Sequence, residues 1–73
     1  MSELTVLDRT GDTRFQWDQR NADEVKAARE HFETFKKKGY AAFKVNKAGG
    51  EGEQIHAFDP KAERVIMPPL VGG

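Results

Sequence analysis

The sequence predicts an α+β fold in which one long helix packs across one mixed sheet. Three observations support this prediction: apolar residues recur at helical spacing between residues 22 and 38, strictly alternating residues precede them, and short β-rich runs follow them. We expect the order strand, strand, helix, strand, strand, strand. A chain of 73 residues can bury only one small core, so these elements belong to one domain.

An N-terminal hairpin is the first expected element. Residues 4–7 are rich in apolar and β-branched side chains, and residues 13–17 alternate so that Phe15 and Trp17 share one face. Residues 8–11 begin with Asp and end with Gly, which suits a tight turn between the two strands.

The helix is expected to span residues 22–38. Asn21 lies three residues before Glu24, which gives an approximate capping box at the N-terminus. Acidic residues at the start, three lysines at the end and the following Gly39 suit the helix dipole and a left-handed stop. The residues of the apolar stripe are Ala22, Val25, Ala28, Phe32 and Phe35.

Three short strands are expected after the helix. They are expected at residues 40–45, 54–58 and 64–67. Residues 46–52 contain three glycines, which is typical of a loop, and residues 59–62 carry Pro at the second position of a type I turn. Pro68 and Pro69 end the last strand, because neither ring can donate a hydrogen bond to a neighbouring strand.

Composition excludes several classes of protein. The chain carries 12 basic and 12 acidic side chains, and this balance argues against a protein that binds nucleic-acid backbones. Because there is no cysteine, disulfides and thiolate zinc sites are excluded. We expect no secretory signal, because residues 1–8 lack a cationic start followed by a long apolar stretch, and the sequence contains no apolar run of about 20 residues, the length of a membrane span. We expect a cytoplasmic monomer that does not cross a membrane.

Residues suited to catalysis or metal binding are few. Ser2 is the sole serine, so nucleophilic catalysis has almost no candidate. His31 and His56 lack the further ligands, at suitable spacing, that a zinc site needs. Glu51 and Glu53 belong to the glycine-rich loop, which is unsuited to a fixed catalytic geometry. We therefore expect no enzyme activity, no metal and no cofactor.

One segment resembles an RNA-binding motif and another resembles a phosphate-binding loop. Residues 38–45 resemble the aromatic strand of an RNA-recognition motif, but that fold needs a second helix that this chain cannot supply. Residues 49–53 are glycine-rich but lack the Lys-Ser or Lys-Thr pair of a phosphate-binding loop. Nucleic-acid contact through the clustered lysines is kept only as an alternative.

The last residues suit a reaction at the terminal carboxyl group. A folded domain at residues 1–69 precedes a tail at residues 70–73 that ends in two glycines. Glycines leave the carboxylate free of neighbouring side chains, so a narrow active site could admit the tail and present the carboxylate to ATP. The product would be an acyl adenylate that accepts a thiol, a sulfide or an amine. Leu70 and Val71 would supply apolar contact, and the preceding prolines would stiffen the exit and project the tail outward.

The order of elements and the closing Gly72 and Gly73 resemble the ubiquitin-like β-grasp superfamily over the whole chain. Residues 67–73, Met-Pro-Pro-Leu-Val-Gly-Gly, look like the tail of the small, sulfur-carrying subunit of molybdopterin synthase. The hairpin at residues 4–17 looks more like ubiquitin itself. The resemblance implies a β-grasp roll of order ββαβββ and activation of Gly73 by an ATP-dependent activating enzyme. Val71 stands where ubiquitin has an arginine before its glycines.

Three functions follow from these observations. In the first, the chain is a ubiquitin-like modifier whose Gly73 is conjugated to lysine amines of target proteins. In the second, the activated end becomes a thiocarboxylate and the chain is a sulfur carrier. In the third, the chain is a non-covalent adaptor that binds a partner through a strand edge or a sheet face.

An activating enzyme would need an apolar docking surface on the domain. The candidates for this surface are Phe43, Val45, Ile55 and Phe58. Surface lysines could also accept a further copy of the chain. These lysines are Lys26, Lys36, Lys37, Lys38, Lys44, Lys47 and Lys61.

Overall fold

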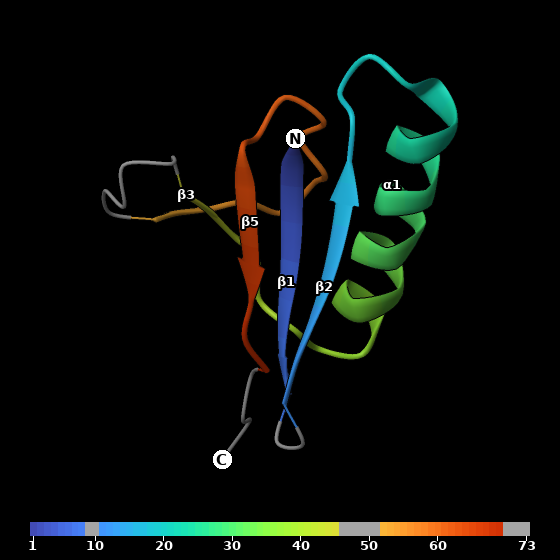
Figure 1. Cartoon of the computed structure of the whole chain (residues 1–73). Helices are drawn as coiled ribbons and strands as arrows, with labels where there is room; N and C mark the ends of the chain where they lie inside the picture. The colour runs from blue at the N-terminus through green and yellow to red at the C-terminus, as the bar shows by residue number, and fades with distance from the viewer. Residues whose placement is uncertain (9–10, 46–51, 70–73) are drawn as a thin grey trace.

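In the computed structural model, which describes residues 1–8, 11–45 and 52–69, one helix packs against a five-stranded mixed sheet (Figure 1). The elements are β1 (Ser2–Asp8), β2 (Gly11–Trp17), α1 (Ala22–Lys37), β3 (Phe43–Val45), β4 (Glu53–Gln54) and β5 (Arg64–Met67). The strand order is β2-β1-β5-β3-β4. β1 and β5 are parallel, and the other neighbours are antiparallel. The predicted α+β class and order of elements are confirmed.

The N-terminal hairpin is present as predicted. β1 and β2 pair from Ser2–Trp17 to Asp8–Gly11, which leaves two residues between the strands. Gly11 has a φ of 133°, a conformation that favours glycine. Phe15 packs against the core and Trp17 is fully buried, whereas Thr13 is exposed because β2 extends beyond the last turn of α1 (Figure 1).

The caps of α1 explain where the helix begins and ends. The Asn21 side chain accepts hydrogen bonds from the backbone N–H groups of Asp23 and Glu24 at 3.1 and 3.3 Å. The Glu24 carboxylate accepts from the Asp18 backbone N–H at 3.0 Å and from the Asn21 amide at 2.9 Å. This differs from a full capping box, because the Asn21 N–H donates to the Asp18 carbonyl instead. Gly39 follows the helix with a φ of 97°.

Replacement of Asn21 by alanine should lower the free energy of unfolding by about 1 kcal/mol, because two helix N–H groups lose their acceptor. Urea denaturation followed by circular dichroism measures this loss. Asn21→Ser is the matched control, since its hydroxyl keeps an acceptor at the cap without a second carboxylate beside Glu24, and it should stay close to the wild type. Equal destabilisation by the two substitutions would contradict the role of the cap.

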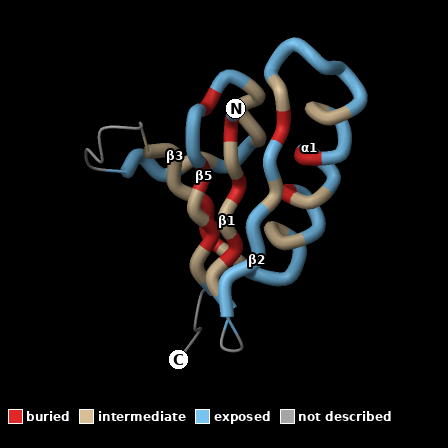
Figure 2. The backbone as a smooth tube through the Cα atoms, viewed as in Figure 1, coloured by how far each residue is buried: buried red, intermediate tan, exposed pale blue. Residues whose placement is uncertain are grey.

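The core lies between α1 and the covered face of the sheet. Its buried residues are Leu4, Val6, Trp17, Ala28, Phe32, Ala42, Ala62, Val65 and Met67. The indole N–H of Trp17 donates to the Pro60 carbonyl at 3.0 Å, which ties β2 to the turn before β5. The Phe58 ring lies 5.2 Å from the Trp17 ring and 5.7 Å from the Phe32 ring. Figure 2 shows buried positions on the inner strands and on the helix side that faces them.

The strands after the helix are shorter than predicted. β3 begins at Phe43 rather than at residue 40, because Tyr40 makes only an isolated bridge to Pro69. β4 ends at Gln54 instead of continuing to residue 58. Beyond β4 the chain bends, and Phe58 packs on the core rather than continuing a ladder. The predicted turn at 59–62 is confirmed by a 3.1 Å backbone hydrogen bond between its end residues.

Candidate functional site

The two prolines that precede the predicted tail are anchored to the sheet. Pro69 forms an antiparallel bridge with Tyr40, and the Pro68 carbonyl accepts a hydrogen bond from the Ala41 N–H at 3.0 Å. β5 ends at Met67 as predicted, but the two prolines then continue beside the chain that leads into β3. The expectation that the prolines project the tail outward concerns residues 70–73 and stays a prediction. The predicted positions Leu70, Val71, Gly72 and Gly73 lie outside the described residues.

The sheet face opposite the helix forms a second candidate site, the open face. Leu4, Val6, Val65 and Met67 point into the core, so their neighbours along β1 and β5 point the other way. Residues that pair across neighbouring strands lie on the same face of the sheet, so the partners of these residues on the adjacent strands also belong to the open face. The apolar residues of the open face are Leu7, Ile66, Phe43 and Val45, and its polar or charged residues are Glu3, Thr5, Asp12, Arg14, Gln16, Gln54 and Arg64.

The open face combines a shallow apolar surface with charged neighbours. A hollow of about 210 Å³ lies among its residues on β1, β2 and β5. Arg14 Nε lies 3.6 Å from Glu3 Oε1, with the Arg14 side chain 67% exposed. The Glu3 side chain is only 19% exposed, so Arg14 is the charge of this pair that remains able to meet a partner. The arrangement suits binding of a protein surface.

The structure divides the four predicted docking residues between two faces. Phe43 pairs with Ile66 and Val45 pairs with Arg64, so both lie on the open face and are half-buried. Ile55 and Phe58 instead pack against the core. The docking role of Phe43 and Val45 stays a prediction.

Two apolar members of the open face, Leu7 and Ile66, were not among the predicted residues. Strand alternation could have identified them, since Leu7 follows the buried Val6 and Ile66 lies between two buried residues. The backbone also approaches this face closely at Gly52. A Cβ atom there would lie 3.1 Å from Val45 Cγ1, so a larger residue at this position would press on the open face.

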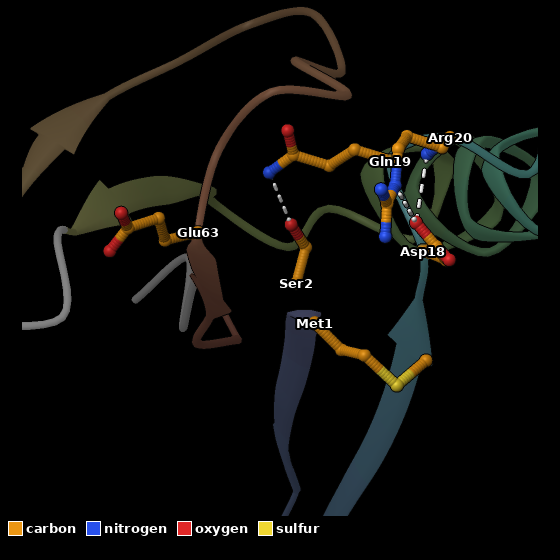
Figure 3. Close-up of a pocket in the computed structure, with 6 residues that line it drawn as sticks. All are labelled: Met1, Ser2, Asp18, Gln19, Arg20 and Glu63. Atoms are coloured by element: carbon orange, nitrogen blue, oxygen red, sulfur yellow. Dashed lines mark hydrogen bonds and ion pairs between the residues drawn. The ribbon is translucent and has the colours of Figure 1, made fainter.

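A polar network closes the end of the sheet near the N-terminus (Figure 3). Ser2 is 1% exposed, and its hydroxyl oxygen accepts a hydrogen bond from Gln19 Nε2 at 2.8 Å. The same Gln19 amide lies 3.2 Å from the Lys61 carbonyl, which it also bonds. Arg20 contacts Asp18 through an ion pair of 3.7 Å. The sole serine therefore links β1, through Gln19, to the connection before α1 and to the turn before β5, and the described residues that line its pocket include no histidine.

The two histidines lie in different surroundings. The His31 ring stacks on Phe15 with ring centres 3.8 Å apart, between α1 and β2. His56 is exposed beyond β4. Within the described ranges, no group of three potential metal-binding side chains comes together.

An ion pair connects β3 to the turn before β5. Lys44 Nζ lies 3.2 Å from Asp59 Oδ2, and the two side chains are 37% and 34% exposed. The Lys61 backbone N–H donates to the other Asp59 oxygen at 3.0 Å. This backbone hydrogen bond, joined by the hydrogen bond and charge of Lys44, lowers the pKa of Asp59 below its usual 3.8. Lys44 is thus engaged, whereas Lys26, Lys37, Lys38 and Lys61 are exposed, Lys36 is half-buried and Lys47 lies outside the described residues.

The lowered pKa of Asp59 makes part of the stability dependent on pH. A carboxylate with a lower pKa in the folded state stabilises the fold above its unfolded pKa, and this contribution is lost as the pH falls through the folded pKa. We expect Asp59→Asn to lose less stability than the wild type as the pH falls below 3.8. Urea denaturation across acidic pH measures the difference. Glu33→Gln on the exposed side of α1 is the control, and parallel pH profiles for the wild type and Asp59→Asn would contradict the assignment.

Comparison of the chain with protein-family models, curated proteins and solved structures finds no match. No helix in the described part of the chain is long and apolar enough to span a membrane.

Proposed function

We propose that the chain is a ubiquitin-like protein of the β-grasp type whose Gly73 carboxylate is activated by adenylation and transferred to amines of target proteins. The strand order β2-β1-β5-β3-β4, with a parallel central pair and a helix after the first hairpin, supports the β-grasp assignment. The sequence that follows this sheet, Leu-Val-Gly-Gly, supports the reaction. Trimming of a longer precursor would expose the same carboxylate.

The anchored Pro68–Pro69 segment is the observation that carries this proposal. β5 lies in the sheet interior, and the two hydrogen-bonded or bridged prolines fix the chain up to the first residue of the tail. The four residues beyond Pro69 can span at most about 14 Å when extended. An activating enzyme must therefore bring its ATP site within this distance of the domain, and so it must contact the domain itself.

The open face supplies a surface for that contact. β5 carries Ile66 on this face near its C-terminal end, and Phe43 and Val45 lie on the neighbouring strand. Binding there would hold the enzyme against the strand from which the reactive end leaves. Arg14 and Arg64 at the border are exposed and would favour an acidic rim on the partner.

The second candidate function is sulfur transfer, which the anchored Pro68–Pro69 segment supports. Activation would be the same, but sulfide would replace the adenylate and leave a thiocarboxylate on Gly73. A segment held rigidly beside Tyr40 suits insertion of the end into a second enzyme, because little of its conformational freedom remains to be lost on binding. Conjugation to lysine needs the same activation but releases the chain onto a target amine.

One experiment separates these outcomes. The chain, tagged at its N-terminus, is expressed in its source cells, purified under denaturing conditions and analysed by mass spectrometry. After cleavage by trypsin at Arg64, peptides that carry residues 65–73 as a branch on target lysines support the modifier. A gain of about 16 Da on the free chain, from replacement of oxygen by sulfur at the activated acyl group, supports the carrier. An unmodified chain that binds a partner non-covalently would contradict both and leave the adaptor.

A further inference from the structure

The outer strand β2 presents a free edge. It lies at one end of the strand order, and residues 11–14 and 16 are exposed (Figure 2). The Glu3 N–H donates toward β5, to the Glu63 carbonyl at 3.0 Å, and not toward its β2 partner Gln16. Bonded and non-bonded pairs alternate along antiparallel strands. Asp12, Arg14 and Gln16 therefore direct their backbone N–H and C=O groups to the free edge.

We propose that this edge pairs with β2 of a second copy of the chain, antiparallel, with Thr13 on the two-fold axis. In this register Asp12 lies opposite Arg14 of the second copy, and Arg14 lies opposite its Asp12. Both members of each pair have outward-directed backbone groups, so the ladder hydrogen bonds can form. The two sheets then join into one. The sequence predicts a monomer and gives no sign of this pairing, because the sequence alone does not show which strand lies at the edge of the sheet.

Side chains favour the same register on both faces. Two pairs of opposite charge lie on the open face, and opposite charges directly across a ladder stabilise strand pairing. On the other face Thr13 meets its own copy, a favourable pair in sheets. Phe15 lies opposite Gly11 of the second copy, so this register sets no side chain against the Phe15 ring, which stacks on His31 of its own chain.

Like charges disfavour the neighbouring registers. A shift of two residues in one direction places Asp12 opposite Asp12 of the second copy, and a shift in the other direction places Arg14 opposite Arg14. A shift by one residue places residues whose backbone groups point to the free edge opposite residues whose backbone groups point to β1. The hydrogen bonds between the two strands then cannot form. Charged residues commonly protect an edge from unselective pairing. In β2 the charged residues disfavour the other registers and favour only the one with Thr13 on the two-fold axis.

Cysteine cross-linking tests the proposed axis, because the chain has no cysteine of its own. Thr13 and its copy form a non-hydrogen-bonded pair, in which Cα atoms lie about 4.5 Å apart, within the range of about 4.4–6.8 Å for a disulfide. We expect Thr13→Cys to form a disulfide-linked dimer on mild oxidation. Thr34→Cys, on the exposed side of α1, is the control and should stay monomeric at the same protein concentration. Equal cross-linking of the two variants would overturn the proposal.

Charge reversal tests the register. In the Thr13→Cys background, Asp12→Arg places two pairs of like charges across the axis and should slow cross-linking about tenfold. Arg14→Asp should have the same effect. The double variant Asp12→Arg/Arg14→Asp restores opposite charges and should recover the original rate. Circular dichroism checks that each variant is folded, and a rate that does not respond to either single reversal would overturn the register.

Discussion

Deletion of Gly72 and Gly73 is expected to abolish every ATP-dependent product of the chain. Without these residues the carboxylate belongs to Val71, whose branched side chain stands beside the reacting carbon and blocks a narrow active site. Conjugates in an extract of the source cells, detected through an N-terminal tag, measure the effect. Appending a bulky residue after Gly73 should have the same result, because it buries the reactive position inside the chain.

The deletion should leave the fold unchanged. The last described contacts of the chain are those of Pro68 and Pro69, which precede the deleted residues. Equal urea denaturation of the wild type and the deletion variant verifies this point. Glu33→Ala on the exposed side of α1 is the control for the assay and should retain full conjugation. Persistence of conjugates in the deletion variant would contradict the proposed chemistry.

Trp17→Ala is expected to unfold most of the protein. Trp17 is fully buried, packs against Phe58 and holds the Pro60 carbonyl through its indole N–H. Truncation of a buried tryptophan costs about 3–5 kcal/mol, and small domains are held by only about 5 kcal/mol or little more. Urea denaturation followed by circular dichroism should show a strongly shifted or absent transition.

The matched variant separates packing from hydrogen bonding. Trp17→Phe keeps an aromatic ring in the core but leaves the Pro60 carbonyl without its donor, and it should cost about 1–3 kcal/mol. A variant Trp17→Ala as stable as the wild type would show that the core does not depend on this residue. Equal losses for the two variants would show that the hydrogen bond, and not packing, dominates.

Elements governed by local signals could be predicted from the sequence. The helix depends on its own stripe and caps, and Asn21 and Gly39 mark its two ends as expected. The hairpin follows from alternation around a short turn, and the turn at 59–62 follows from its proline. Each of these signals acts over a few residues, so no knowledge of distant contacts is needed.

Features governed by distant contacts could not be predicted. Residues 55–58 have the composition of a strand, but Phe58 leaves the ladder to meet Trp17 and Phe32, which are far away in the sequence. For the same reason the sequence did not show that Ile55 and Phe58 pack against the core, where both are half-buried. Prolines at 68 and 69 lack N–H donors, yet the Pro68 carbonyl still accepts a bond from Ala41 and keeps the segment at the sheet.

The central claim is that the carboxyl group of Gly73 is activated by ATP, and trapping with hydroxylamine tests it most directly. The purified chain is incubated with an extract of its source cells, ATP and hydroxylamine, and its C-terminal peptide is then analysed by mass spectrometry. The account predicts a hydroxamate on Gly73 that requires ATP and is absent when Gly73 is deleted. A C-terminal carboxylate that stays unmodified, in an extract that activates its other acyl substrates, would contradict it.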